Sequence, residues 1–126
     1  MKMSREVEVD EVVIKGVTYV PKNEQAPAET FEGMEYKLVR TYSAGVFAGY
    51  VESKSGKECV LRKVRRIWYW DGAKSLSQLA VDGTTKPQKC KFPCEVDKIE
   101  LTEAIEYISV TKKAQESIAS VPVWEE

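Results

Sequence analysis

Short alternating runs of apolar and polar residues dominate this chain, and they predict strands rather than long helices. The clearest runs lie at residues 36–42, 46–53 and 58–70. The first two are joined at Ser43-Ala44-Gly45, where glycine permits a positive φ, and a second turn at Lys54-Ser55-Gly56-Lys57 precedes the third. Three such segments in series predict an antiparallel meander.

The third of these segments changes its parity along its length. Leu61 is apolar on one phase, whereas Val64 and both following tryptophans are apolar on the other. Because one extra residue in a strand reverses which side chains face the core, we expect a β-bulge near Arg62-Lys63.

The rest of the second half alternates between helix and strand signals. Ser75 or the preceding lysine begins a short helix that Asp82-Gly83 closes, and Thr111 caps a second helix that runs through Ile118 before Pro122. Between the helices lie a proline-containing loop at 83–94 and two further strand candidates, at 95–101 and 104–110.

The first 35 residues have a different pattern. Residues 6–20 alternate in two short runs around Lys15-Gly16, which predicts a β-hairpin, and residues 21–35 lack periodicity and predict a linker. We therefore expect a hairpin arm and linker over residues 1–35 and an α+β ligand-binding domain over 36–126. The sheet of this domain is mainly antiparallel, with a short helix and a C-terminal helix.

Composition narrows the function classes. The 126 residues include no histidine, which excludes every histidine-based triad or metal site, and the net charge of −1 offers no general field for a nucleic-acid polymer. No run approaches the roughly 18 apolar residues of a membrane span, and the N-terminus does not resemble a signal peptide. We expect a cytoplasmic protein with no membrane partner, no cofactor and no bound metal.

Two segments come close to a phosphate loop and a zinc-ligand pair, but their residue spacing does not match either motif. Gly49 and Gly56-Lys57 are too far apart for a phosphate loop, and Glu58 stands where the loop needs a hydroxyl. Cys90 and Cys94 are separated by one residue more than the usual zinc-ligand pair and have no second pair. Idle thiols are the favoured interpretation.

The strongest chemical signal is the density of arginine and aromatic residues between positions 40 and 70. This quarter of the chain holds four arginines, two of the three tryptophans and three of the six tyrosines. Flat aromatic faces beside fixed cations suit a flat, anionic ligand. On a strand, Arg66, Trp68 and Trp70 would share one face.

Both parts of this signal have a plainer interpretation. The tryptophans can be core residues with the arginines extended over them, and the turn that follows Arg40 can be an ordinary hairpin loop rather than an anion-binding concavity. Scattered carboxylates without a partner base indicate solvated surface. We therefore expect a binding protein rather than an enzyme, with no catalytic residues.

Three segments carry a resemblance to a known family. Arg40–Tyr50 (RTYSAGVFAGY), Arg65–Ala80 (RRIWYWDGAKSLSQLA) and Leu101–Glu106 (LTEAIE) resemble small phage and prophage proteins related to the first type of Thoeris anti-defence protein. The likeness covers about residues 36–124. That resemblance implies a homo-oligomeric sponge in the host cytoplasm, which binds and sequesters the cyclic ADP-ribose isomer made by Thoeris TIR proteins without cleaving it.

Some members of that family also bind cyclic oligonucleotides at a separate site. The alternative is a phage structural or assembly protein whose aromatic strand is an oligomer interface. Within the matching motifs, chemistry selects arginine for phosphates, aromatic rings for the base, and hydroxyl or carboxylate groups for ribose and phosphate oxygens. The candidate ligand-binding residues are Arg40, Tyr42, Ser43, Gly45, Phe47, Arg66, Trp68 and Trp70, with Thr102 and Glu103 from the last motif.

Overall fold

The computed structural model describes residues 26–125, and the predicted hairpin over residues 6–20 lies outside that range. The described part confirms an α+β fold with a five-stranded antiparallel sheet, a short helix and a C-terminal helix. The strands are β1 (Glu35–Thr41), β2 (Val46–Ser55), β3 (Glu58–Ile67), β4 (Val96–Leu101) and β5 (Ala104–Ser109), and the helices are α1 (Leu76–Asp82), η2 (Pro87–Lys89) and α2 (Lys112–Ser120).

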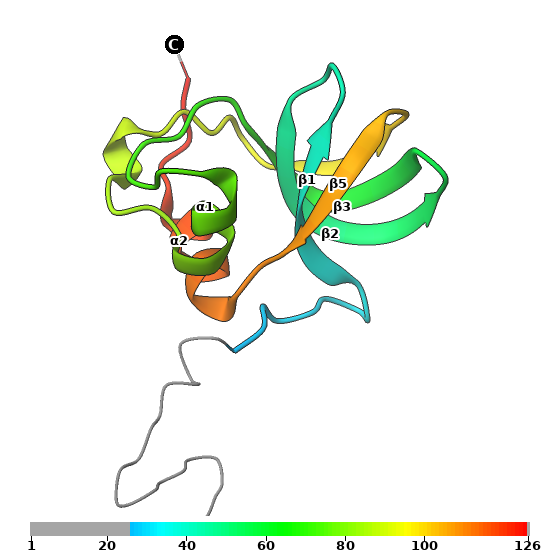
Figure 1. Ribbon diagram of the computed structural model, residues 1–126, viewed down its shortest axis with the longest axis horizontal. Helices are drawn as coiled ribbons and strands as arrows, with labels where there is room; N and C mark the ends of the chain where they lie inside the picture. The colour runs from blue at the N-terminus through cyan, green and yellow to red at the C-terminus, as the bar shows by residue number, and fades with distance from the viewer. Residues whose placement is uncertain (1–25, 126) are drawn as a thin grey trace, which may run out of the picture.

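The sheet has the strand order β4-β3-β2-β1-β5, so the predicted meander forms its centre. The two edge strands are consecutive in the chain and are separated only by Thr102 and Glu103. A two-residue connection between opposite edges requires the sheet to curl until those edges meet at one end. Figure 1 shows this curled sheet on one side of the molecule, with α1 and α2 packed together on the other.

Each face of the curled sheet has its own apolar core. Side chains alternate between the faces of a strand, and neighbours such as Leu38 and Val39 therefore enter different cores. The inner core fills the curl with Val39, Phe47, Cys59, Leu61, Val64, Leu101 and Ala104. The outer core lies between sheet and helices and contains Leu38, Ala48, Ile67, Leu79, Ala80, Cys90, Phe92, Val110, Ala114, Ile118 and Val121.

The predicted bulge in β3 is confirmed. Lys63 has φ +47°, and the pairing of β2 with β3 shifts register between Ala48 and Tyr50. Opposite the shift lies Gly49, whose missing Cβ would stand 2.8 Å from the Cβ of Val64. This position requires glycine because the bulge brings the two backbones together.

Both predicted helix caps are also confirmed. The Ser75 hydroxyl accepts a hydrogen bond from the Gln78 backbone N–H, and the Thr111 hydroxyl accepts one from the N–H of Ala114. Such caps satisfy N–H groups that the first turn leaves without partners. The second helix continues two residues beyond its predicted end, to Ser120.

The second half of the predicted linker packs on the domain. The Ala28 N–H donates to the Val110 carbonyl at 2.9 Å, and the Lys112 N–H donates to the Ala26 carbonyl at 2.7 Å. Phe31 contacts the ring of Tyr50, with centroids 5.5 Å apart. Residues 26–34 are therefore held against β5, α2 and the sheet, which their aperiodic sequence did not indicate.

Candidate functional site

Two of the sequence motifs meet at the end of the sheet where its edges come together. The Ser43 hydroxyl donates to Glu103 Oε1 at 2.6 Å, and the Tyr42 N–H donates to the Glu103 carbonyl at 2.9 Å. Tyr42 is exposed and, with Lys57, Glu103 and Ile105, lines a hollow of about 220 Å³. Thr102 lines a different hollow of about 380 Å³, together with residues of β2, β3 and β4.

The turn at residues 41–45 uses most of its own donors. The Thr41 hydroxyl accepts from the Ala44 N–H at 2.8 Å and donates to the Gly45 carbonyl, and the Thr41 N–H donates to that same carbonyl. Gly45 has φ +100°, as the sequence predicted for this position. Because these groups are already paired, the turn does not present the row of free N–H groups that anion binding requires.

The two arginines predicted to hold phosphates lie on opposite faces of the sheet. Arg40 pairs with Val46 across the ladder and Arg66 pairs with Phe47, and consecutive residues of β2 face opposite ways. Arg40 Nε donates to Glu106 Oε1 at 2.7 Å. Arg66 Nη1 donates to the Ala44 carbonyl at 2.7 Å, and its guanidinium lies 4.6 Å from the Phe47 ring centroid.

Two of the predicted aromatic contacts are core residues. Phe47 has no exposed surface and belongs to the inner core, so its ring cannot stack on a ligand in this structure. Trp70 is half-buried against the outer core. The expected shared face of Arg66, Trp68 and Trp70 is wrong, because β3 ends at Ile67 and the chain turns away into an isolated bridge between Tyr69 and Lys91.

Trp68 instead belongs to an exposed group that we call the aromatic patch: Trp68, Tyr69, Lys91 and Trp124. The indole rings of Trp68 and Trp124 are nearly parallel, with a 7° angle between planes and 6.4 Å between centroids. Trp68 is 63% exposed and Trp124 is 36% exposed. Neighbouring Val123, 50% exposed, extends the apolar surface.

Three distant segments position the patch. The Trp68 N–H donates to the Lys91 carbonyl at 3.1 Å, Tyr69 and Lys91 exchange backbone hydrogen bonds, and the Trp124 N–H donates to the Phe92 carbonyl at 2.9 Å. Sequence reasoning missed Trp124 and Lys91. No periodicity marks either residue, and only these long-range backbone contacts bring them to Trp68.

The patch carries positive charge. Lys91 Nζ lies 5.6 Å from the Trp124 ring centroid and 5.8 Å from that of Tyr69. No carboxylate within residues 26–125 lies at ion-pair distance from Lys91. At this point on the surface, the described part of the chain presents aromatic faces and a lysine ammonium together, whereas the sequence predicted arginine as the cation.

Arg65 holds the segments beneath the patch. The residue is 8% exposed. Its guanidinium donates from Nε to the Pro93 carbonyl, from Nη1 to the carbonyls of Ile118 and Val121, and from Nη2 to those of Phe92 and Pro122, at 2.9–3.4 Å. Burial lowers the pKa of Arg65, against the opposing effect of nearby anionic groups. All five N–H donors are used, so Arg65 has a structural role.

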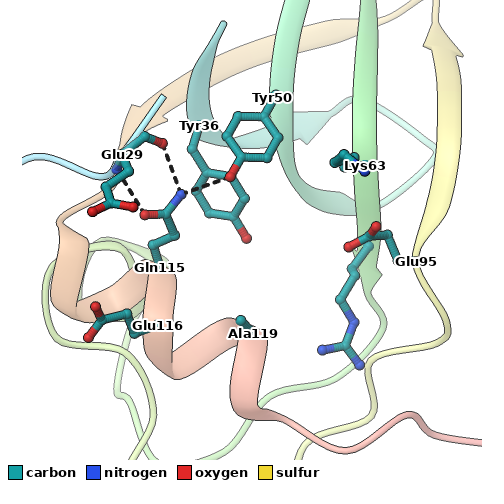
Figure 2. A pocket seen from close by; sticks show the side chains of 9 residues that line it. Glu29, Tyr36, Tyr50, Lys63, Glu95, Gln115, Glu116 and Ala119 are labelled. Atoms are coloured by element: carbon teal, nitrogen blue, oxygen red, sulfur yellow. Dashed lines mark hydrogen bonds between the residues drawn. The ribbon is translucent and has the colours of Figure 1, made fainter. Parts of the chain in front are cut away.

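A cavity of about 320 Å³ lies elsewhere, between α2 and the sheet, and contains none of the predicted ligand-binding residues. Figure 2 shows Tyr36 and Tyr50 on one side of it and Glu116 and Ala119 of α2 below. Within residues 26–125, no group of three or more histidine, cysteine, aspartate or glutamate side chains is arranged to hold a metal ion. In the same range, no helix has the length and apolar character that crossing a membrane requires.

Comparison with known proteins places the chain in a family without giving that family a function. A family model described as a domain of unknown function (DUF6948) matches residues 34–118, and the chain belongs to this family. The match spans the sheet, α1 and most of α2. No curated protein and no solved structure matches the chain.

Proposed function

We propose that this protein binds a cyclic ADP-ribose isomer at the aromatic patch and sequesters it without cleaving it, as an anti-Thoeris sponge acting in the cytoplasm of the bacterial host. The observation that carries the proposal is the exposed parallel pair of Trp68 and Trp124 with Lys91 beside it. An indole face suits the adenine ring, and an ammonium group that no carboxylate of residues 26–125 pairs with suits the pyrophosphate.

The patch is a surface rather than an enclosed pocket, and this supports the homo-oligomer in the proposal. A ligand lying on Trp68 would keep one face in water unless a second chain covered it. Slow release needs exclusion of water. A second copy of the chain packed over the aromatic patch would supply that cover and bury exposed apolar surface at the same time.

Uptake followed by heat release tests the proposal. The purified chain is mixed with cyclic ADP-ribose isomers, freed of unbound nucleotide by filtration, and heated, and the released material is analysed by chromatography. We expect intact nucleotide at no more than one molecule per chain. Altered nucleotide in excess of the protein would contradict the proposal and indicate turnover.

The Trp68→Ala variant assigns the uptake to the patch. Because stacking on an aromatic side chain contributes about 1–3 kcal/mol per base, we expect affinity to fall about fivefold or more, measured by isothermal titration. Lys91→Glu should also weaken binding, whereas Lys98→Glu, a control on exposed β4, should not. Unchanged affinity in a folded Trp68→Ala variant would remove the patch from the site.

The second candidate function is that of a phage structural or assembly protein. The exposure of Trp68 and Trp124 favours this function as well. Clustered exposed aromatic residues are typical of protein interfaces as well as of ligand sites. In that case the chain takes up no nucleotide, and Trp68→Ala lowers the oligomer mass measured by light scattering. Nucleotide uptake by the wild-type chain would exclude assembly as its sole function.

A further inference from the structure

The cavity between α2 and the sheet has the features of a second ligand site. Its volume of about 320 Å³ lies at the lower end of the range of about 300–1,000 Å³ that small-molecule sites occupy. The rings of Tyr36 and Tyr50 meet edge to face, with centroids 5.0 Å apart and planes at 65°, and form its aromatic side. Figure 2 shows the Tyr36 hydroxyl directed into the open space between α2 and Glu95.

One wall of this cavity is fixed by the Gln115 amide. Gln115 Oε1 accepts from the Glu29 N–H at 2.9 Å, and Nε2 donates to the Glu29 carbonyl at 3.1 Å and to the Tyr50 hydroxyl at 3.2 Å (Figure 2). Three bonds to one amide hold the Glu29 backbone, α2 and β2 together. The cavity is therefore formed before any ligand arrives.

The Tyr36 hydroxyl is a polar group without a protein partner in the described chain. No residue of 26–125 makes a hydrogen bond to it, and the hydroxyl is not fully buried, so it is free to bond a molecule in the cavity. Burial raises the pKa of Tyr36 well above its ordinary value, so the hydroxyl stays protonated and can donate. It can donate one hydrogen bond to a ligand in the cavity.

The charges around the cavity do not suit a pyrophosphate. Arg65 lines it, but its five donors are all taken by backbone carbonyls. Glu29 is paired with Lys112 at 3.2 Å, which leaves the carboxylates of Glu95 and Glu116 without an ion pair within residues 26–125. Two unpaired carboxylates repel a dianion.

One available cation balances those carboxylates. Lys63 lines the cavity, with its ammonium 5.1 Å from the Phe31 ring centroid and no carboxylate of the described residues at ion-pair distance. It stands at the bulge of β3 with a positive φ, a conformation that is strained for a lysine. The lining thus offers donors from Tyr36 and Lys63 and an acceptor from Glu95.

We infer that this cavity binds a small zwitterion of the amino-acid type, independently of any nucleotide at the aromatic patch. Its carboxylate is held by the Tyr36 hydroxyl and the Lys63 ammonium. Its ammonium group is held by Glu95, whose carboxylate faces the cavity across from α2 (Figure 2). Its carbon framework lies against the Tyr36 and Tyr50 rings.

Binding of free amino acids to the full-length protein tests this inference. Each of the twenty standard amino acids is titrated up to millimolar concentration, and saturation is followed by ligand-observed NMR. We expect at least one to saturate. We also expect its analogues lacking only the ammonium or only the carboxylate to bind about tenfold more weakly or worse. The inference would be overturned if none of the twenty amino acids saturates the protein. It would also be overturned if an analogue that lacks the ammonium or the carboxylate binds as tightly as its parent amino acid.

Two conservative variants test whether the amino acid binds in this cavity. Tyr36→Phe removes only the hydroxyl and should weaken binding about fivefold or more, and Glu95→Gln removes only the charge and should weaken it about tenfold. The controls are Tyr42→Phe and Glu58→Gln, both exposed and outside the cavity. Wild-type affinity in folded Tyr36→Phe and Glu95→Gln would remove the ligand from this cavity. Nucleotide uptake, measured in parallel, should not change in either variant.

Discussion

Arg65 and Arg66 are neighbours in the sequence, yet their guanidinium groups make different kinds of contact. Arg65 is buried and donates to five backbone carbonyls, whereas Arg66 lies over the Phe47 ring and donates to Ala44. A strand sends consecutive side chains to opposite faces, so each arginine meets a different core. The pair RR in a sequence therefore does not indicate a joint anion site when it lies on a strand.

Replacing Arg65 with methionine should destabilise the protein severely. The methionine fills part of the space but removes a donor from five carbonyls, of which only those of Phe92 and Ile118 keep a backbone N–H partner. Removal of one partner from such a buried charged network costs about 3 kcal/mol or more. Urea unfolding measures the loss. Arg62→Met is the control, since this partly exposed arginine makes ion pairs with Glu52 and Asp97 and a single hydrogen bond to a carbonyl, that of Asp97. This variant should leave the urea midpoint close to that of the wild type. Similar midpoints for the two variants would contradict the structural role of Arg65.

At the scale of the elements, the end of β3 determines which aromatic residues are accessible. The strand stops at Ile67, and the next three residues follow a bridge to Lys91 instead of the ladder. Trp68 therefore points to solvent near Trp124, whereas Trp70 packs on the outer core. Uninterrupted strand geometry would have kept both tryptophans on one face.

The bulge in β3 requires a glycine at the facing position of β2, and this requirement can be tested. Gly49→Ala places a Cβ 2.8 Å from the Cβ of Val64, and overpacking of this kind typically costs about 1–3 kcal/mol. We expect a lower urea midpoint for Gly49→Ala in the wild-type background. In a Val64→Gly background the same change should cost less, because the Val64 Cβ at 2.8 Å and the methyl group at 3.1 Å are gone. Equal costs in the two backgrounds would show that the close approach is not responsible.

For the whole molecule, the curl of the sheet and the packing of α2 partly bury three tyrosine side chains. Burial is the main cause that raises the pKa of Tyr36, Tyr50 and Tyr107 above the ordinary value. The Tyr107 hydroxyl has no hydrogen-bond partner within the described residues. The folded state therefore keeps these protons at a pH where the unfolded chain has begun to lose them.

Stability should consequently fall as the pH rises above about 10, the ordinary pKa of tyrosine. The unfolded chain binds fewer protons than the folded chain in the window from about pH 10 up to the higher folded-state pKa values, so raising the pH favours unfolding. Urea midpoints between pH 8 and 11 measure the slope. Tyr107→Phe should make the decline shallower, and an identical slope in that variant would refute this assignment.

Much of the fold follows from local sequence signals. The three-strand meander, the bulge near Lys63 and the caps at Ser75 and Thr111 are all present where the pattern predicted them. Each depends on interactions within a few residues, such as alternation, a turn glycine or a hydroxyl three residues before an N–H. For the candidate site, the sequence indicated that Trp68 contacts a ligand, and this stays a prediction. The sequence also selected the turn at residues 41–45 as a candidate for ligand binding, but it did not show which residues surround that turn.

Local pattern determined which segments are strands and helices, and tertiary structure decided which side chains are available to a ligand. Strand parity alone cannot tell whether Phe47 or Trp68 is buried, because both faces of this curled sheet carry a core and the third strand ends before the tryptophans. Trp124 and Lys91 join Trp68 only through backbone hydrogen bonds between segments that are far apart in the chain. The physical reason is that burial and proximity depend on the packing of the whole chain, whereas alternation and capping depend on nearest neighbours.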